Sequence, residues 1–131
     1  MPIAKELTIR VEDKPGTLAQ CCRPLADRDV NILAFQAFER EGQSVIRMVV
    51  DDHATAKKLL DAERIYYTET EVAQVALPHC SGELFRAASR LGEAGVNINY
   101  AYCGTKPGTS MSLVVFGVTD VAKAVFLLVP G

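Results

Sequence analysis

The sequence predicts an α+β fold in which one β-α-β-β-α-β unit occurs twice. Three observations support this prediction: the chain aligns with itself at an offset of 66 residues, each half alternates between strand-like and helix-like hydrophobic spacing, and turn residues recur at matching positions. A chain of 131 residues has room for two small domains. We therefore expect one domain over residues 1–70 and a second over residues 71–131.

The self-alignment runs without a gap and pairs identical residues at turns, helix ends and core positions. The matched pairs include Gly16 with Gly82, Leu18 with Leu84, Leu25 with Leu91, Val30-Asn31-Ile32 with Val96-Asn97-Ile98, and Ala56-Lys57 with Ala122-Lys123. Because these residues occupy structurally distinctive positions in one register, the halves are interpreted as two copies of one unit.

The elements of the first copy follow from local patterns. Leu7, Ile9 and Val11 alternate with polar residues, which predicts a half-buried strand. After it we expect, in order, a turn over 13–16, a helix over 18–25, strands over 30–39 and 44–51 joined at Glu41-Gly42-Gln43, a helix over 53–61 and a strand over 64–70. This order is that of the ferredoxin-like fold, in which two helices cover one face of an antiparallel sheet.

The second copy has the same pattern up to its last strand. We expect, in order, a strand over 71–77, a turn over 78–82, a helix over 83–94, strands over 96–103 and 111–118, and a helix over 120–128. The last residue, Gly131, aligns with Ile65, so the second copy is expected to lack its fourth strand. Strand 71–77 would then be a bare sheet edge unless another segment covers it. Residues 64–77 contain neither Pro nor Gly, so we expect strand to pass directly into strand and to couple the two copies.

Composition excludes several classes of protein. Hydrophobic residues make up 49% and charged residues 23% of the chain, which is typical of a folded domain and not of a disordered one. No apolar run reaches the roughly 18–20 residues of a membrane span, and the start does not resemble a secretory signal. The formal net charge of −2 gives no reason to expect nucleic-acid binding. Four cysteines without a C-x-x-C pair indicate reduced thiols in a cytoplasmic protein.

Two segments carry a family resemblance. Val11-Glu-Asp-Lys-Pro-Gly-Thr-Leu18, followed by Leu25-Ala-Asp-Arg-Asp-Val-Asn-Ile32, resembles the ACT domain family. The second copy shows the same pattern in Leu77-Pro-His-Cys-Ser-Gly-Glu-Leu84 and Leu91-Gly-Glu-Ala-Gly-Val-Asn-Ile98. Together the two copies are similar to the stand-alone tandem ACT proteins of bacteria.

The resemblance implies a regulatory protein without catalytic activity that binds an amino acid where two ACT domains meet. It also implies pairing, so we expect a homodimer or larger assembly. The alternative is a regulatory subunit that docks on a metabolic enzyme without a ligand of its own. Serine-binding members carry an Asn six residues after the glycine, where this chain has Cys22 and Ala88, so serine specificity is not implied.

The candidate ligand-binding residues lie in and after the two loops between the first strand and the first helix of each copy. They are Asp13, Gly16, Thr17, Leu18 and Asn31 in the first copy and Ser81, Gly82, Glu83, Leu84 and Asn97 in the second. A helix N-terminus has unpaired amide donors that favour a carboxylate, and glycine permits close approach of a ligand. Asp13 either holds an ammonium group or caps the helix, and Asn31 and Asn97 either contact ligand or bond the backbone.

Catalytic and metal chemistry find little support. His79 and Cys80 are adjacent at a helix start, as a nucleophilic thiol would require, but neighbouring side chains in an extended loop point apart. The sequence contains none of the common phosphate-loop, dinucleotide-binding or zinc-protease motifs, so we expect no catalytic residue, no cofactor and no metal. Tyr100 and Tyr102 are expected to share a face with Ile98 and to pack in the core, and the alternative is that they line a binding site.

Overall fold

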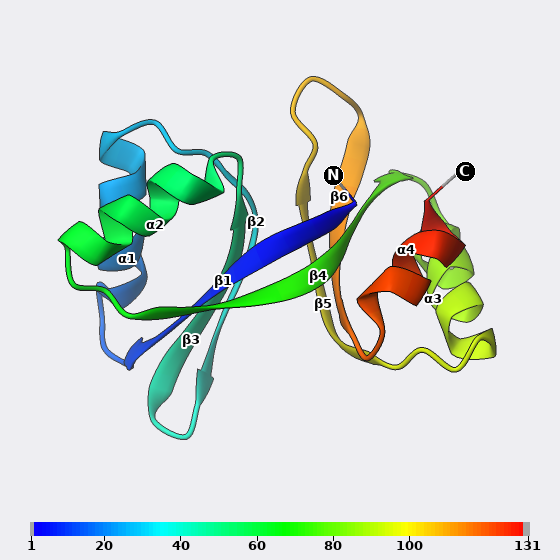
Figure 1. The fold of residues 1–131 in the computed structure, drawn as a ribbon, viewed down its shortest axis with the longest axis horizontal. Helices are drawn as coiled ribbons and strands as arrows, with labels where there is room; N and C mark the ends of the chain where they lie inside the picture. Colours follow the sequence, from blue (N-terminus) through cyan, green and yellow to red (C-terminus); the bar gives the residue numbers. More distant parts are fainter. Residues whose placement is uncertain (1, 130–131) are drawn as a thin grey trace. The chain divides into compact units, whose positions relative to one another are not determined.

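A computed structural model of the protein describes residues 2–129 and contains two compact units. The first, here the first repeat, is Lys5–Thr70, and the second, here the second repeat, is residues 71–129 together with residues 2–4. Two long strands, β1 (Ile3–Glu12) and β4 (Tyr67–Pro78), contribute residues to both units (Figure 1). The continuous β4 confirms the expected passage from strand to strand without a linker.

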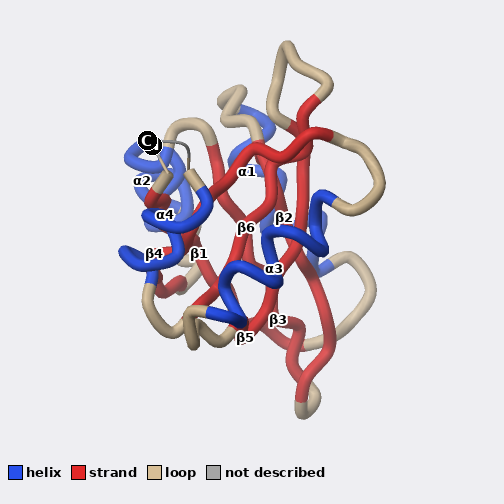
Figure 2. Tube along the Cα trace, turned by 90° about the vertical axis from the view of Figure 1, so that its right-hand side faces the viewer, coloured by secondary structure: helices blue, strands red, loops and turns tan. Residues whose placement is uncertain are grey.

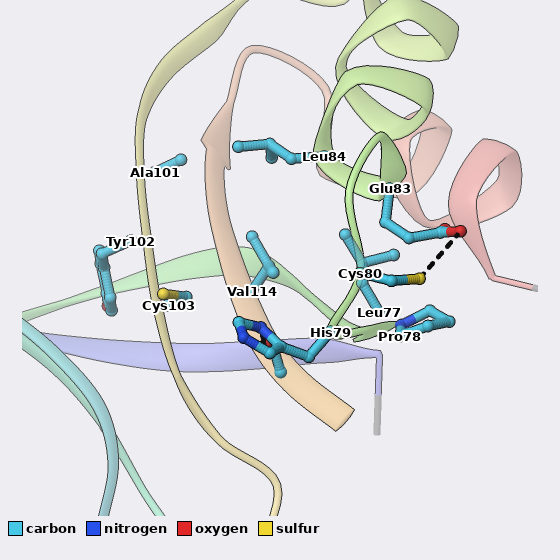
Figure 3. Close-up of a pocket in the computed structure, with 11 residues that line it drawn as sticks. Leu77, Pro78, His79, Cys80, Glu83, Leu84, Ala101, Tyr102, Cys103 and Val114 are labelled. Atoms are coloured by element: carbon cyan, nitrogen blue, oxygen red, sulfur yellow. Dashed lines mark hydrogen bonds between the residues drawn. The ribbon is translucent and has the colours of Figure 1, made fainter. Parts of the chain in front are cut away.

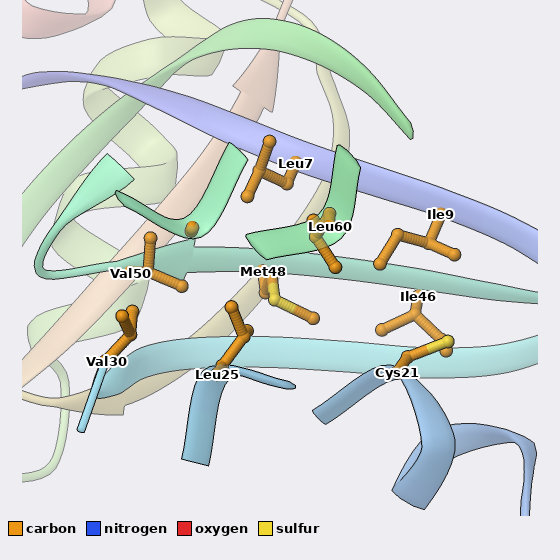
Figure 4. Close-up of a cluster of buried hydrophobic side chains, with 10 residues drawn as sticks. Leu7, Ile9, Cys21, Leu25, Val30, Ile46, Met48, Val50 and Leu60 are labelled. Carbon is orange, nitrogen blue, oxygen red and sulfur yellow. The ribbon is translucent and has the colours of Figure 1, made fainter. Parts of the chain in front are cut away.

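In the first repeat, β1 pairs with β3 and β3 with β2, both antiparallel, and β4 lies beside β1. The elements are α1 (Thr17–Asp27), β2 (Ile32–Arg40), β3 (Gln43–Val50) and α2 (His53–Ala62), with parts of β1 and β4. The helices lie on one face of the sheet, and apolar side chains from both layers meet between them (Figure 4). These buried residues are Leu7, Ile9, Cys21, Leu25, Val30, Ile46, Met48, Val50, Ala56 and Leu60.

The second repeat has the same order of elements. They are β4, α3 (Glu83–Glu93), β5 (Ile98–Thr105), β6 (Met111–Val118) and α4 (Val121–Leu128), and β6 pairs antiparallel with both β4 and β5. Figure 2 shows the strands in red and the helices in blue. The core of this repeat comprises Ala73, Val75, Ala87, Leu91, Val96, Val114, Phe116, Ala124 and Leu128. None of the helices within residues 2–129 is long and apolar enough to cross a membrane.

The expected gap-free register of 66 residues is wrong after the hairpin of each repeat. Asp52 accepts a hydrogen bond from the Thr55 amide at the start of α2, and Asp120 accepts one from the Lys123 amide at the start of α4. These caps lie 68 positions apart, because the loop from β5 to β6 is longer than the loop from β2 to β3. The matches of Ala56-Lys57 with Ala122-Lys123 are therefore coincidental, and the buried counterpart of Ala56 is Ala124. The comparison of Gly131 with Ile65 lies outside the described residues.

The edge of strand 71–77 is covered by another segment of the chain. The amide of Gln74 donates a hydrogen bond of 2.7 Å to the carbonyl oxygen of Pro2, so the start of the chain runs beside β4. Within residues 2–129 no strand follows α4, and residues 2–4 take the place beside β4 in the second repeat. Sequence analysis missed this because residues 2–4 precede the alignable repeat.

A β-bulge moves Tyr100 and Tyr102 away from the expected face. The register of β5 against β6 shifts between Ile98 and Tyr100, so Ile98 faces the core and the two tyrosines face the other side of the sheet. There their rings stack, with centroids 6.4 Å apart. The alternation of side chains along a regular strand predicted core packing for both tyrosines. A bulge inserts one residue and so reverses the face of every later side chain, which the alternation does not take into account.

Candidate functional site

Both loops that precede the first helix of a repeat end on a glycine in the left-handed region. Gly16 has φ 89° and Gly82 has φ 88°, and each is the N-cap residue of its helix, α1 or α3. A glycine supplies no side-chain cap. The first amide of each helix, from Thr17 or Glu83, donates to the carbonyl oxygen of Lys14 or Cys80, which leaves the next amides of the first turn as donors for another group. A side chain at either position would strain the backbone, since φ near +90° is rarely adopted by other residues.

In the second repeat this loop forms one wall of a pocket of about 290 Å³ (Figure 3). The other walls come from the first turn of α3, from β5 and from β6. The pocket is lined by Leu77, Pro78, His79, Cys80, Glu83, Leu84, Ala101, Tyr102, Cys103, Ser112 and Val114. Its surface is mainly apolar, with a few polar groups at the loop, as is typical of small-molecule sites.

The polar groups of the pocket bond one another in pairs. His79 Nδ1 lies 3.3 Å from Ser112 Oγ, and the Cys80 thiol donates to Glu83 Oε1 at 3.9 Å. Glu83 Oε1 also accepts a hydrogen bond of 2.5 Å from Arg86, and this bond raises the pKa of Arg86. His79 and Cys80 therefore do not bond each other as a base and nucleophile would.

The first repeat uses the equivalent positions differently. Asp13 Oδ1 accepts a hydrogen bond of 3.0 Å from Ser44, which is the counterpart of the contact between His79 and Ser112. Thr17, the counterpart of Glu83, is buried, and its hydroxyl donates to the carbonyl oxygens of Glu12 and Lys14 at 3.1 and 2.8 Å. Through these two hydrogen bonds, the buried Thr17 hydroxyl fixes the backbone of the loop.

A second difference lies on the strand that faces the helix. Phe35 occupies the position in β2 that Ala101 occupies in β5, directly opposite a core residue of the neighbouring strand in each case. The phenyl ring stands where the second repeat has only a methyl group. The small side chain of Ala101 therefore leaves space on β5 that Phe35 would occupy in the first repeat.

The predicted site residues of the loops and helix starts fall into three groups. Glu83 and Leu84 line the pocket, and Gly82 starts α3 beside it. Ser81 and Leu18 are exposed on their loops. Asp13, Gly16 and Thr17 form the loop of the first repeat described above.

Asn31 and Asn97 act through their backbones. The Asn31 amide donates to Asp51 Oδ1 at 3.0 Å, and the Asn97 amide donates to Thr119 Oγ1 at 3.1 Å. The Asn97 side chain bonds that of Asn99 at 2.9 Å. These contacts differ from the predicted bond between an asparagine side chain and the backbone, because the backbone amide of each asparagine is the donor to a side chain.

Sequence analysis missed the strand residues of the pocket, above all Ala101, Cys103 and Ser112. The signal available was the corrected repeat register, which aligns Ser112 with Ser44 and Ala101 with Phe35. The sequence analysis considered His79 and Cys80 only as a catalytic pair.

Burial raises the pKa of the Cys21 and Cys22 thiols, as expected for thiols packed under a helix.

The family model of the ACT domain matches residues 5–65. No curated protein sequence matches this chain. Among solved structures, protein BT0572 from Bacteroides thetaiotaomicron superposes with a TM-score of 0.84 and 26% identity, over 96% of this chain and 86% of that chain.

Two regulatory subunits of aspartate kinase share the fold at lower similarity. The ligand-free subunit from Thermus thermophilus gives a TM-score of 0.61 at 18% identity, over 96% of this chain and 90% of that one. The subunit from Thermus flavus gives 0.58 at 19% identity, over 95% and 88%. Residues 5–65, which match the model of the ACT domain family, lie within the first repeat.

Proposed function

We propose that the protein is a regulatory module without catalytic activity that binds an amino acid in the pocket of the second repeat. The two repeats would act as two ACT domains, one over residues 1–70 and the other over residues 71–131. Support comes from the family match and from the regulatory subunits that share the fold. Four free thiols agree with a cytoplasmic location.

The observation that carries the proposal is the pocket against the first turn of α3. Its volume of about 290 Å³ lies at the lower end of ligand sites, which suits a molecule the size of one amino acid. The ligand carboxylate would meet the first-turn amides of α3, where the helix dipole favours negative charge. The Glu83 carboxylate would accept from the ammonium group, and Leu77, Leu84 and Val114 would surround an apolar side chain.

The test is a thermal-shift screen of the common amino acids followed by calorimetry with each that raises the melting temperature. Ala101→Phe introduces the first repeat's Phe35 and should weaken binding at least tenfold by filling the pocket. Gly82→Val should also weaken it, because its side chain meets Arg86 at 3.1 Å and φ is positive. Lys57→Ala, on α2, is the control and should bind normally. Unchanged affinity in both pocket variants would contradict the placement.

We also propose that two copies of the chain form a dimer. The observation that supports this is an exposed apolar side chain on α4. Phe126 on α4 is 83% exposed, whereas α2 carries Lys58 at the same position. Val125 likewise replaces Lys57, so a helix surface that is charged in the first repeat is apolar in the second. An exposed apolar helix face favours burial against a second copy. Light scattering should give a dimer mass for the native chain and a monomer mass for Phe126→Lys; a monomeric native chain at tens of micromolar would refute pairing.

A further inference from the structure

We propose that the first repeat binds a phosphoryl group in a pocket built by Arg10, Arg40 and Arg47. The pocket has a volume of about 280 Å³, and its lining is predominantly polar. It lies where the three strands β1, β2 and β3 meet the hairpin that joins β2 to β3. The remaining lining residues are Phe38, Glu41, Gln43 and Val45.

Strand register brings the arginines together. Arg10 of β1 lies directly opposite Val45 of β3, and Phe38 of β2 lies opposite Val45 from the other side. Arg40 lies opposite Gln43 at the end of the same ladder. Because opposed side chains share a face, residues from three strands project to one side of the sheet.

The hairpin fixes the position of Arg40. Its two loop residues are Glu41 with φ 52° and Gly42 with φ 82°, the positive values of the tight turn that suits twisted strands. The Gly42 amide also donates to Glu39 Oε2 at 2.8 Å, which ties that carboxylate to the loop. Arg40 therefore directly precedes a tight turn that this hydrogen bond holds.

Arg10 and Arg40 form no ion pair or hydrogen bond through their side chains with any residue between 2 and 129. Glu12, the next acidic residue on the same face of β1, pairs instead with Lys14 at 3.8 Å. Only Glu41 contributes a negative charge to the lining. The pocket thus concentrates positive charge in a chain whose formal net charge is −2.

Arg47 is held in place at the floor of this pocket. Its side chain is 15% exposed, and its Nε lies 3.9 Å from the buried Glu6 carboxylate. Its Nη1 donates to Gln36 at 3.3 Å, and its guanidinium stacks over the Phe38 ring at 5.1 Å. An arginine fixed by such contacts loses little side-chain entropy when it binds a ligand.

The second repeat shows that the fold does not require these arginines. Its equivalent positions hold Ala76 for Arg10, Val115 for Arg47 and Gly104 for Phe38. The only basic counterpart is Lys106, which corresponds to Arg40. The same strands and hairpin therefore form without a cationic pocket, which indicates that the cluster in the first repeat serves a ligand.

The number of guanidinium groups in the pocket favours a phosphoryl group over a carboxylate. A carboxylate has two oxygens in one plane and is satisfied by one bidentate guanidinium. A terminal phosphoryl group carries three oxygens and up to two negative charges, which three guanidinium groups from different strands can approach from separate sides. The volume accommodates a ligand of about the size of pyrophosphate.

The test is calorimetry of the full chain with sodium pyrophosphate, repeated with ADP and with citrate. We expect one site per chain, with affinity that falls as salt is raised. Arg10→Ala and Arg40→Ala should each weaken binding at least tenfold, because both residues are exposed and their loss should leave the fold intact. Lys106→Ala is the matched control from the second repeat and should bind within twofold of the native chain.

The ligand series separates the sources of the phosphoryl group. Tighter binding of ADP than of pyrophosphate would assign a nucleotide, and equal or weaker binding of ADP would assign a free polyphosphate. Citrate that binds as tightly as pyrophosphate would overturn the phosphoryl assignment. Absence of binding heat at millimolar pyrophosphate, or native affinity in the Arg10→Ala/Arg40→Ala double variant, would overturn the site itself.

Discussion

The two repeats have the same backbone plan but place their candidate sites on opposite faces of the sheet, both near its hairpin end. The second repeat leaves a mainly apolar pocket beside the helix that follows its first strand, whereas the first repeat closes that place with Thr17 and Phe35. The first repeat concentrates arginines at the hairpin end, where the second has Ala76 and Val115. Both proposed sites therefore depend on side chains that differ between the repeats at equivalent positions.

The helices show the same division. In the first repeat, Glu69 of β4 accepts from His53 at 2.6 Å and from Lys57 at 3.3 Å. In the second repeat, Val121 and Val125 occupy the positions of His53 and Lys57, so α4 presents no comparable ionic network. The second helix of the first repeat therefore carries ionic side chains, whereas that of the second repeat carries apolar side chains at the same positions.

The largest predicted loss of stability, equal in the two repeats, comes from substitutions in their hydrophobic cores. Leu25 and Leu91 are equivalent and both fully buried, so Leu25→Ala and Leu91→Ala should each lower the free energy of unfolding by about 2–5 kcal/mol through lost contacts and a residual cavity. Urea unfolding measures both. Leu84→Ala, which removes a side chain that is 59% exposed, should cost less than about 1 kcal/mol. A cost below 1 kcal/mol at only one of the two core positions would break the equivalence.

The next prediction concerns a cross-strand pair of residues whose larger member lies on different strands in the two repeats. Tyr100 lies opposite Gly117, and the equivalent pair in the first repeat is Ala34 opposite Val49. A Cβ built on Gly117 would meet the Tyr100 ring at 2.3 to 2.6 Å, so Gly117→Val should destabilise by about 1–3 kcal/mol or prevent folding.

Restoring the first repeat's pair supplies the control for this prediction. Tyr100→Ala combined with Gly117→Val installs alanine opposite valine and should recover most of the stability lost in the single variant. A double-mutant cycle in urea measures the coupling between the two positions. If the double variant were no more stable than Gly117→Val alone, the corrected register of 68 residues would lose its support at this pair.

Sequence patterns predicted the order and approximate bounds of the helices and strands, because each element carries its own signal. Hydrophobic spacing marked the strands and helices, and Gly16 and Gly82 marked the turns before the helices. The errors arose where one or two inserted residues change the register. The bulge after Ile98 reversed the face of two tyrosines, and the longer second hairpin moved the repeat offset.

The candidate sites were less predictable, since they depend on contacts between distant segments. The pocket of the second repeat joins the loop before α3 to Ala101 and Ser112, which local motifs do not connect. The arginine pocket joins three strands through their register. Residues 2–4 pair with β4 although they belong to no recognisable motif. Such placements require the strand pairing, which a single sequence does not specify.

The smallest predicted effect is a difference in acid sensitivity between the two helices α2 and α4. A hydrogen bond from His53, with a second from Lys57, holds the pKa of Glu69 below its ordinary value, and hydrogen bonds from Thr55 do the same for the pKa of Asp52. A carboxylate with a lowered pKa in the folded state stabilises the fold above its unfolded pKa, and this contribution disappears as the pH falls through the folded value.

We therefore expect the native chain to lose stability between about pH 5 and pH 3 in part through α2. Glu69→Gln should lose less over this interval, because its neutral side chain has no charge to lose, and should be less stable than the native chain at pH 6. Glu71→Gln, at an exposed position on the same strand, is the control and should follow the native pH dependence. Urea unfolding at pH 6, 4.5 and 3, with amide signals of α2 and α4 followed separately by NMR, measures the difference. Equal acid sensitivity of the two helices in the native chain, unaltered by Glu69→Gln, would show that the ionic network on α2 adds nothing to the stability of the first repeat.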